Sequence, residues 1–119
     1  MDKSQALNAF WNRFLPAYDQ STVKEGTQFP YITYDVSISP MNEVSMTASL
    51  WYRERTWENI SKKADEISKA IGIGGTLLKT NQGYIWIKRA NPFAQRMADE
   101  DDSIRRIVIT VFAEYLEED

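Results

Sequence analysis

The sequence contains no cysteine and no histidine among its 119 residues. Without cysteine, the chain forms no disulfide and carries out no thiolate chemistry. Without histidine, it lacks the commonest general base and the commonest metal ligand, which excludes Ser-His and Cys-His nucleophile arrangements. Carboxylates and lysines still allow some catalysis. The residue types nevertheless favour a protein that is not an enzyme and that uses no cofactor and no metal.

Long apolar runs and an excess of positive charge are also missing. The longest apolar run, Ile107–Ala113 with Thr110 inside it, is far shorter than the about 20 residues that a membrane-spanning helix needs. The first four residues form no apolar signal region. The net charge of −3 gives no electrostatic footprint for nucleic acid. We therefore expect protein partners, with no membrane and no specific nucleic acid bound.

Aromatic residues, by contrast, are plentiful. The chain has four Trp, six Tyr and five Phe, and each ring buries roughly 150–250 Å² when it is packed. A chain of this length fits one domain and leaves no room for a second. The sequence therefore predicts a single domain over residues 1–119 with an aromatic-rich core.

Two segments have the apolar spacing of amphipathic helices. The first is expected to be capped by Ser4 and ended by Pro16, and its apolar stripe consists of Leu7, Phe10, Trp11 and Phe14. The second runs from about Trp57 to Ile71, with Thr56 as its cap and Gly72 as its end. Its stripe consists of Trp57, Ile60, Ala64, Ile67 and Ile71.

Strands are predicted where apolar and polar residues alternate. Residues 32–38 and 44–52 alternate in this way around an expected turn at Ser39–Asn42, and 76–79 and 84–89 form a hairpin. The last strand, 104–116, is apolar on both faces, with Val108 and Phe112 on the second. Such a strand is either central in the sheet or covered by another subunit. Residues 18–28 and Ala90–Asp102 are expected to be loops.

The order α-β-β-α-β-β-β indicates an α+β fold, with a mainly antiparallel sheet and two helices packed on it. Each predicted core residue belongs to one of the stripes or alternating segments. They are Leu7, Phe10, Trp11, Phe14, Ile32, Val36, Leu50, Ile60, Ile67 and Ile71. The face of the sheet turned away from them, which includes Tyr31 and Trp51, suits either water or a protein interface.

Three motifs are candidates for chemistry. Gly72–Gly75 follows a helix and precedes a strand, so a helix cap and turn is favoured over a phosphate-binding loop. The acidic run Asp99–Asp102 lacks the spacing of a calcium loop. A salt-bridged surface or an intersubunit contact is favoured there over a metal site or a carboxylate-based hydrolase. A set of basic and aromatic residues near strand ends leaves a single-stranded nucleic-acid-binding module as an alternative; it consists of Arg53, Arg55, Lys88, Arg89, Trp51, Trp57, Tyr84 and Trp86.

The predicted Ala90–Asp102 loop is the main candidate interface. Loops of about 12–15 residues without secondary structure are uncommon and usually functional or disordered. We expect Phe93 and Met97 to dock on a neighbouring subunit or on a tube protein, with Arg96 orienting the loop through a carboxylate. A loop folded over its own domain is the alternative. The full set of candidate interface residues is Tyr31, Trp51, Phe93, Arg96, Met97, Asp99, Asp101 and Arg105.

Several segments resemble a family of small tail proteins of long-tailed bacteriophages. They are Phe29–Tyr34, Ser49–Arg53 running into Thr56-Trp57, Ile85–Arg89, Asn91–Met97 and Ile104–Arg106. The chain is similar over about Ala6–Glu117 to the tail-terminator (tail-completion) group, whose lambda-type members are hexameric rings. These motifs are structural rather than chemical.

The resemblance implies a virion protein at the tail–head junction that assembles in the cytoplasm of a bacterial host. Such a subunit forms a ring, expected to be a hexamer, that caps the tail tube, stops its polymerisation and offers a surface to the head. The implied partners are further copies of the chain, the tail-tube protein and a head-completion or neck protein. A head-closure protein or another neck or minor tail protein is the alternative within the same class.

Overall fold

The computed structural model describes residues 1–39 and 43–117. The helices are α1 (Lys3–Asn12) and α2 (Glu58–Ile71). The strands are β1 (Ala17–Asp19), β2 (Tyr31–Tyr34), β3 (Val44–Arg53), β4 (Thr76–Thr80), β5 (Gly83–Met97) and β6 (Ile104–Glu117). The predicted turn at Ser39–Asn42 lies, apart from Ser39, outside the described residues. Within those residues, no helix is long and apolar enough to cross a membrane.

The strands form one sheet in the order β1-β2-β3-β6-β5-β4. β1 runs parallel to β2, and the other neighbouring strands run antiparallel. The sheet is therefore mixed and has six strands, which corrects the expected mainly antiparallel sheet of five. β1 was missed because it has only three residues, two of which, Tyr18 and Asp19, lie in the predicted polar loop 18–28, and because it shows no alternation. The α+β class, with two helices and one domain, is confirmed.

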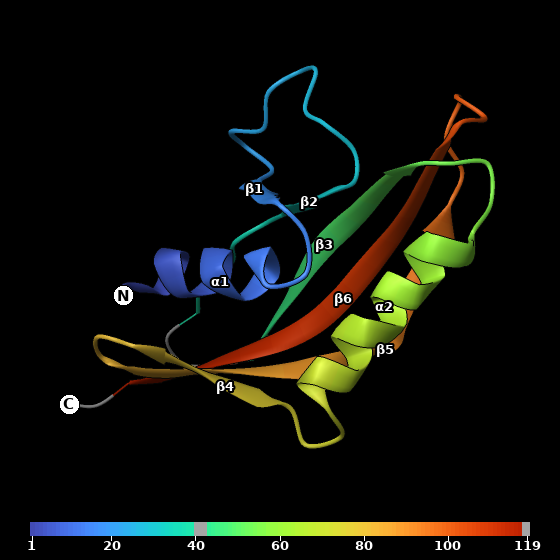
Figure 1. Cartoon of the computed structure of the whole chain (residues 1–119). Helices are drawn as coiled ribbons and strands as arrows, with labels where there is room; N and C mark the ends of the chain where they lie inside the picture. The colour runs from blue at the N-terminus through green and yellow to red at the C-terminus, as the bar shows by residue number, and fades with distance from the viewer. Residues whose placement is uncertain (40–42, 118–119) are drawn as a thin grey trace.

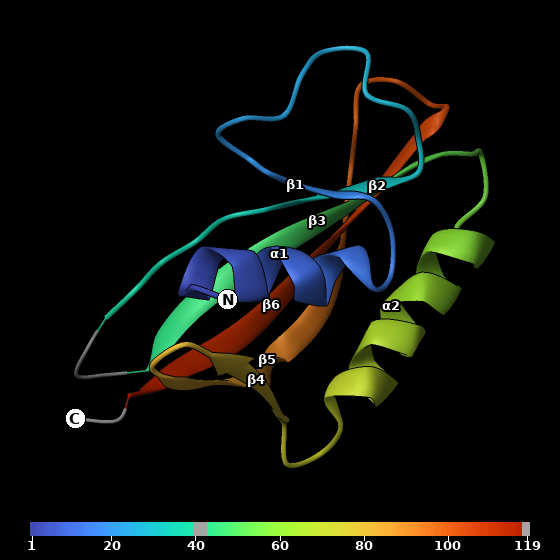
Figure 2. The same ribbon diagram turned by 60° about the vertical axis from the view of Figure 1, so that its left-hand side comes forward.

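Both helices pack on the same face of the sheet, which we call the helix face. α1 lies across the β1–β4 side and α2 along β3, β6 and β5 (Figure 1). In the turned view α1 crosses in front of β3 and β6, and α2 stands beside β5 (Figure 2). The inward side chains of helices and sheet make a single core. Nine of the ten predicted core residues are buried, whereas Val36 is partly buried and packs against the core.

The helix ends differ from the sequence-based expectation. Asp2, and not Ser4, caps α1, because its side chain accepts a bond from Gln5 N at 2.8 Å and the Gln5 side chain accepts one from Asp2 N at 3.0 Å. Ser4 has no Glu or Gln three residues later to complete such a reciprocal cap. α2 begins at Glu58 with Trp57 at the N-cap and no side-chain capping bond, so Thr56 is not the cap. Gly72 ends α2 at φ 77°, as predicted.

Two strand predictions need correction. β2 ends at Tyr34 rather than continuing to residue 38, because Asp35 takes over the contact with β3. Its carboxylate accepts from Thr47 N at 2.9 Å and from the Thr47 hydroxyl at 3.2 Å. β5 continues to Met97, so residues 90–97 are not a loop. A bulge between Arg89 and Ala94 interrupts its pairing with β6, and Pro92, which has no N–H to donate, lies inside that bulge.

Burial raises the pKa of Tyr31, Tyr52 and Tyr115, and the carboxylates of Glu54 and Glu66 add to the effect at Tyr52. A raised folded-state pKa means that the unfolded chain ionises first, near pH 10. Stability from these groups is present below that pH and lost as the pH rises through the folded-state pKa. We expect the free energy of unfolding, measured by urea titration at a series of pH values, to fall as the pH rises above about 10.

The tyrosine-to-phenylalanine variant of Tyr115 is the control for this prediction. It also loses the 2.8 Å bond from the Tyr115 hydroxyl to the Ser37 carbonyl, which costs about 1 kcal/mol near neutral pH. Between about pH 9 and 11, where tyrosine titrates, the free energy of unfolding of the variant should fall less than that of the wild type. An unchanged pH dependence in Tyr115→Phe contradicts the assignment.

Candidate interface on the open sheet face

The second face of the sheet, opposite the helices, carries the side chains that alternate with the core residues. We call it the open face. No helix among residues 1–39 and 43–117 covers it. Its end nearest the β5–β6 turn is aromatic and basic, its middle holds hydroxyl groups, and its other end is apolar. Each region is formed by side chains from several strands, so the register of the sheet decides which residues meet.

Four of these residues form a row across four strands, which we call the Trp51 row. Tyr31 on β2 pairs with Trp51 on β3, Trp51 pairs with Arg106 on β6, and Arg106 pairs with Met97 on β5. Tyr31, Trp51 and Met97 were all predicted as interface residues, and the sheet brings these three together. Arg106, which joins them, was not in the predicted set because only the register shows that it faces the same way.

The Trp51 row is held in place by hydrogen bonds and ring contacts. The Trp51 indole N–H donates to the Thr33 hydroxyl at 2.9 Å, and its ring stacks beside Tyr31 with centroids 6.2 Å apart. The Arg106 guanidinium lies 4.7 Å from the Trp51 ring and donates to the Ser49 hydroxyl at 3.1 and 3.0 Å. Because these bonds fix the rotamers, the row presents a preorganised surface of aromatic rings and one cation.

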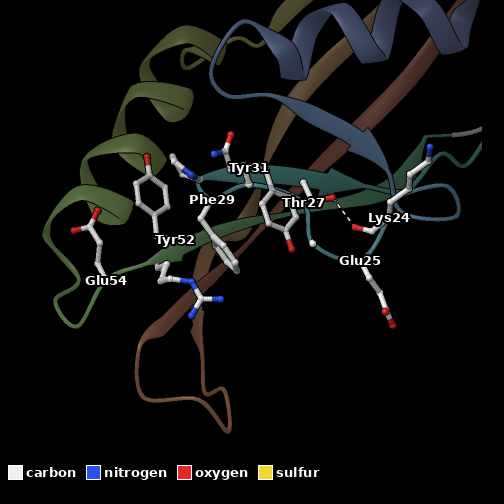
Figure 3. A pocket seen from close by; sticks show the side chains of 11 residues that line it. Lys24, Glu25, Thr27, Phe29, Tyr31, Tyr52 and Glu54 are labelled. Carbon is white, nitrogen blue, oxygen red and sulfur yellow. Dashed lines mark hydrogen bonds between the residues drawn. The ribbon is translucent and has the colours of Figure 1, made fainter.

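Beside this row lies a groove of about 640 Å³ between residues 24–31 and 52–54. Figure 3 shows Phe29 and Tyr31 together on one side of β3 and Tyr52 on the other. The Arg53 guanidinium lies 4.7 Å from the Phe29 ring. Both cations, such as Lys24, and anions, such as Glu25, line the groove. Mixed charge around aromatic rings suits a polypeptide surface better than a phosphate group.

The turn between β5 and β6 carries the acidic run Asp99–Asp102. Asp101 accepts bonds from Ser103 N at 2.8 Å and from its hydroxyl at 2.7 Å, and these bonds hold the pKa of the Asp101 carboxyl below its usual value. Arg53 lies 3.9 Å from the same carboxylate. In the part of the chain that the structure describes, no acidic group is arranged to hold a metal ion.

Three predicted interface residues lie on the helix face instead. Phe93 is partly buried and packs against the core. Arg96 and Arg105 flank the Trp57 ring, with guanidinium carbons 4.8 and 5.3 Å from its centroid. Arg96 thus contacts an aromatic ring, and no carboxylate of the described residues lies within ion-pair distance of it. Arg96 and Arg105 therefore hold the turn end of the β5–β6 hairpin against Trp57 at the N-cap of α2.

The apolar end of the open face was missed from the sequence. We call it the apolar patch; it consists of Leu77, Tyr84, Trp86, Phe112 and Leu116. Leu77 is 55% exposed, and Tyr84, Phe112 and Leu116 are 36–40% exposed. An ion pair between Lys88 and Glu114 borders it. The doubly apolar pattern of the last strand pointed to Phe112, but only the pairing of β4, β5 and β6 gathers the other four.

The basic and aromatic residues that suggested nucleic-acid binding do not form one surface. Arg53 and Trp51 lie at the turn end of the open face, whereas Trp86 and Lys88 lie at the apolar end. Lys88 forms ion pairs with Glu43 and Glu114. Arg89 lies on the helix face, where it donates to the Ser68 hydroxyl at 2.8 Å. A continuous stacking track for single-stranded nucleic acid is therefore not assembled by this set.

Comparisons with known proteins show similarity at the level of the fold. No family model matches the sequence, and no curated protein matches it. Among solved structures, a chain described as "Virion of native gene transfer agent (GTA) particle" has a similar fold, with a TM-score of 0.58 and 18% sequence identity. The alignment covers 90% of this chain and 81% of that chain.

Proposed function

We propose that this chain is a structural virion protein of a long-tailed bacteriophage that acts by binding other protein subunits. The observation that carries the proposal is the shared fold with a chain of a phage-like virion particle over 90% of this chain. The resemblance of its segments to tail-completion proteins agrees with it. In this role the protein is not an enzyme, and its surfaces rather than a catalytic site determine its activity.

Within that class we propose the tail terminator. Copies form a ring, expected to be a hexamer, that caps the tail tube and joins it to the head. A subunit in such a ring needs at least two separate contact surfaces, one toward its neighbours and one toward the tube or the head. The open face supplies two of different chemistry, the Trp51 row and the apolar patch. An apolar centre bordered by charged residues is the usual anatomy of a protein interface.

The test is deletion of the gene in its phage or prophage, followed by complementation in trans. We expect the deletion to yield tails of uncontrolled length that do not join heads, because nothing stops polymerisation of the tube. Tail lengths and head attachment are measured by electron microscopy. Tails of normal length that fail to join heads would instead indicate a head-closure or neck protein, and normal virions would contradict the whole proposal.

A further inference from the structure

The acidic turn and the Trp51 row have opposite charge and lie on different parts of the surface. Asp99, Glu100, Asp101 and Asp102 are all exposed. Within residues 1–39 and 43–117, only Asp101 of these four has an ion-pair partner, Arg53 at 3.9 Å. The turn projects beyond the end of β3 (Figure 1). Three carboxylates are therefore presented to the surroundings at the far end of a two-stranded arm.

The Trp51 row provides the complementary surface. Arg106 is held by Ser49 and Trp51, and no carboxylate of the described residues lies within 4.0 Å of its guanidinium. Met97, at the end of the row, is 41% exposed. Trp, Tyr and Arg are the residues most enriched among those that dominate binding energy at protein interfaces. An arginine fixed on an aromatic ring can also donate hydrogen bonds to a carboxylate with little loss of side-chain entropy.

We propose that the Asp99–Asp102 turn of one copy docks on the Trp51 row of a second copy of this chain. This proposal rests on the proposed function, because that function requires copies of the chain to bind one another. It specifies the two surfaces through which they bind. The turn and the row are different surfaces, so the interface is heterologous. A heterologous contact closes into a ring when its rotation closes and otherwise gives an open filament, whereas a contact between identical patches stops at a pair.

The turn that binds the Trp51 row comes from a second copy and not from the same chain. Asp101 and Ser103 hold the turn near Arg53, beyond the end of the row. Arg53 pairs with Ile104, and Arg106 lies further along β6 on the open face. The strand pairing therefore directs the carboxylates past the sheet end and away from Arg106. The turn that covers the row is therefore supplied by a second copy, related to the first by rotation.

Charge reversal tests the contact in the purified full chain, with self-association measured by sedimentation. The first variant carries Arg106→Glu, and the second carries both Glu100→Lys and Asp102→Lys. Each should weaken self-association at least about tenfold, because like charges then face each other. Combining all three substitutions in one chain should restore it, as should mixing the two weakened variants. The matched control Lys69→Glu, on the exposed side of α2, should have no effect. If the two weakened variants do not associate with each other when they are mixed, the proposal is wrong.

Disulfide cross-linking gives a second readout, which is clean because the wild type has no cysteine. Differently tagged copies carrying Glu100→Cys and Gln95→Cys are mixed under mild oxidation. Gln95 is exposed on the open face, one alternation along β5 from Met97. The mixed product should form at least about tenfold faster than with the control pair Glu100→Cys and Lys69→Cys, because docking raises the effective concentration.

The outcomes separate this contact from the proposed function. The contact is contradicted if the Gln95→Cys pair and the control pair cross-link at equal rates. It is also contradicted if the wild type stays monomeric at every concentration and no selective cross-link forms. The deletion test does not depend on either readout. If the deletion leaves tails normal while charge reversal still controls self-association, the contact stands and the terminator role fails.

Discussion

Replacing Gly83 by alanine is expected to lower the free energy of unfolding by roughly 2–4 kcal/mol, among the larger effects of a single substitution. Gly83 begins β5 at a φ of +150°, a conformation that side chains rarely adopt. An added Cβ would overlap the Leu116 carbonyl oxygen and lie 3.0 Å from its carbon and 3.1 Å from Glu117 Cα. The neighbours are backbone atoms of β6, so the two strands would have to separate.

Equilibrium urea unfolding measures this loss, and two other glycines serve as controls. Gly74 lies in the turn after α2 and has nothing within 4 Å of an added Cβ, so Gly74→Ala should change stability by less than about 0.5 kcal/mol. Gly26 has equal space but a φ of +79°, and Gly26→Ala should cost about 1 kcal/mol through backbone strain alone. If Gly83→Ala costs no more than Gly26→Ala, the close approach of β6 is not the cause.

The long periodic elements were predictable because each is determined by its own sequence. The stripe from Ile60 to Ile71 and the alternation along 44–52 place apolar groups on one side at the period of a helix or a strand. Packing on a common core then follows, and nine of the ten predicted core residues are buried. For these elements the local pattern and the tertiary structure agree.

Residues 90–97 were mispredicted because a distant partner decides their structure. Asn91 and Pro92 are strong local signals for a turn. β6, however, offers pairing partners on both sides of them, and β5 bulges there and then continues through Ala94 to Met97. The gain from further strand pairing outweighs the local preference. The same reasoning applies to β1, whose three residues become a strand only because β2 lies beside them.

The candidate site was partly predictable for a similar reason. Alternation along the strands placed Tyr31 and Trp51 on the face turned away from the core, and Met97 was a candidate as an apolar residue in the predicted loop Ala90–Asp102. Assigning each to a face needs the register, because a shift of one residue moves a side chain to the other face. The bulge in β5 makes such a shift. It leaves Phe93 packed against the core and places Met97 on the open face beside Arg106.

The apolar patch should be required for assembly and dispensable for folding. Phe112 and Leu116 are 36% and 39% exposed, so a glutamate at either position keeps contact with water in the free subunit. Each variant should change the free energy of unfolding by no more than about 1 kcal/mol, the range of strand preferences. In an interface the same glutamate would be buried without a partner, which weakens binding by about 2 kcal/mol or more.

We therefore expect Phe112→Glu and Leu116→Glu to fold normally and yet fail to complement a deletion of the gene, with tail lengths and joined heads scored by electron microscopy. Ile73→Glu is the matched control, since Ile73 is 98% exposed and lies in the turn after α2, off the open face. It introduces the same charge at an exposed apolar site and should complement fully. Complementation by all three variants would mean that the apolar patch faces solvent in the assembled particle. Failure of Ile73→Glu as well would point to a general effect of added negative charge, because Ile73 lies outside the apolar patch that Phe112 and Leu116 share.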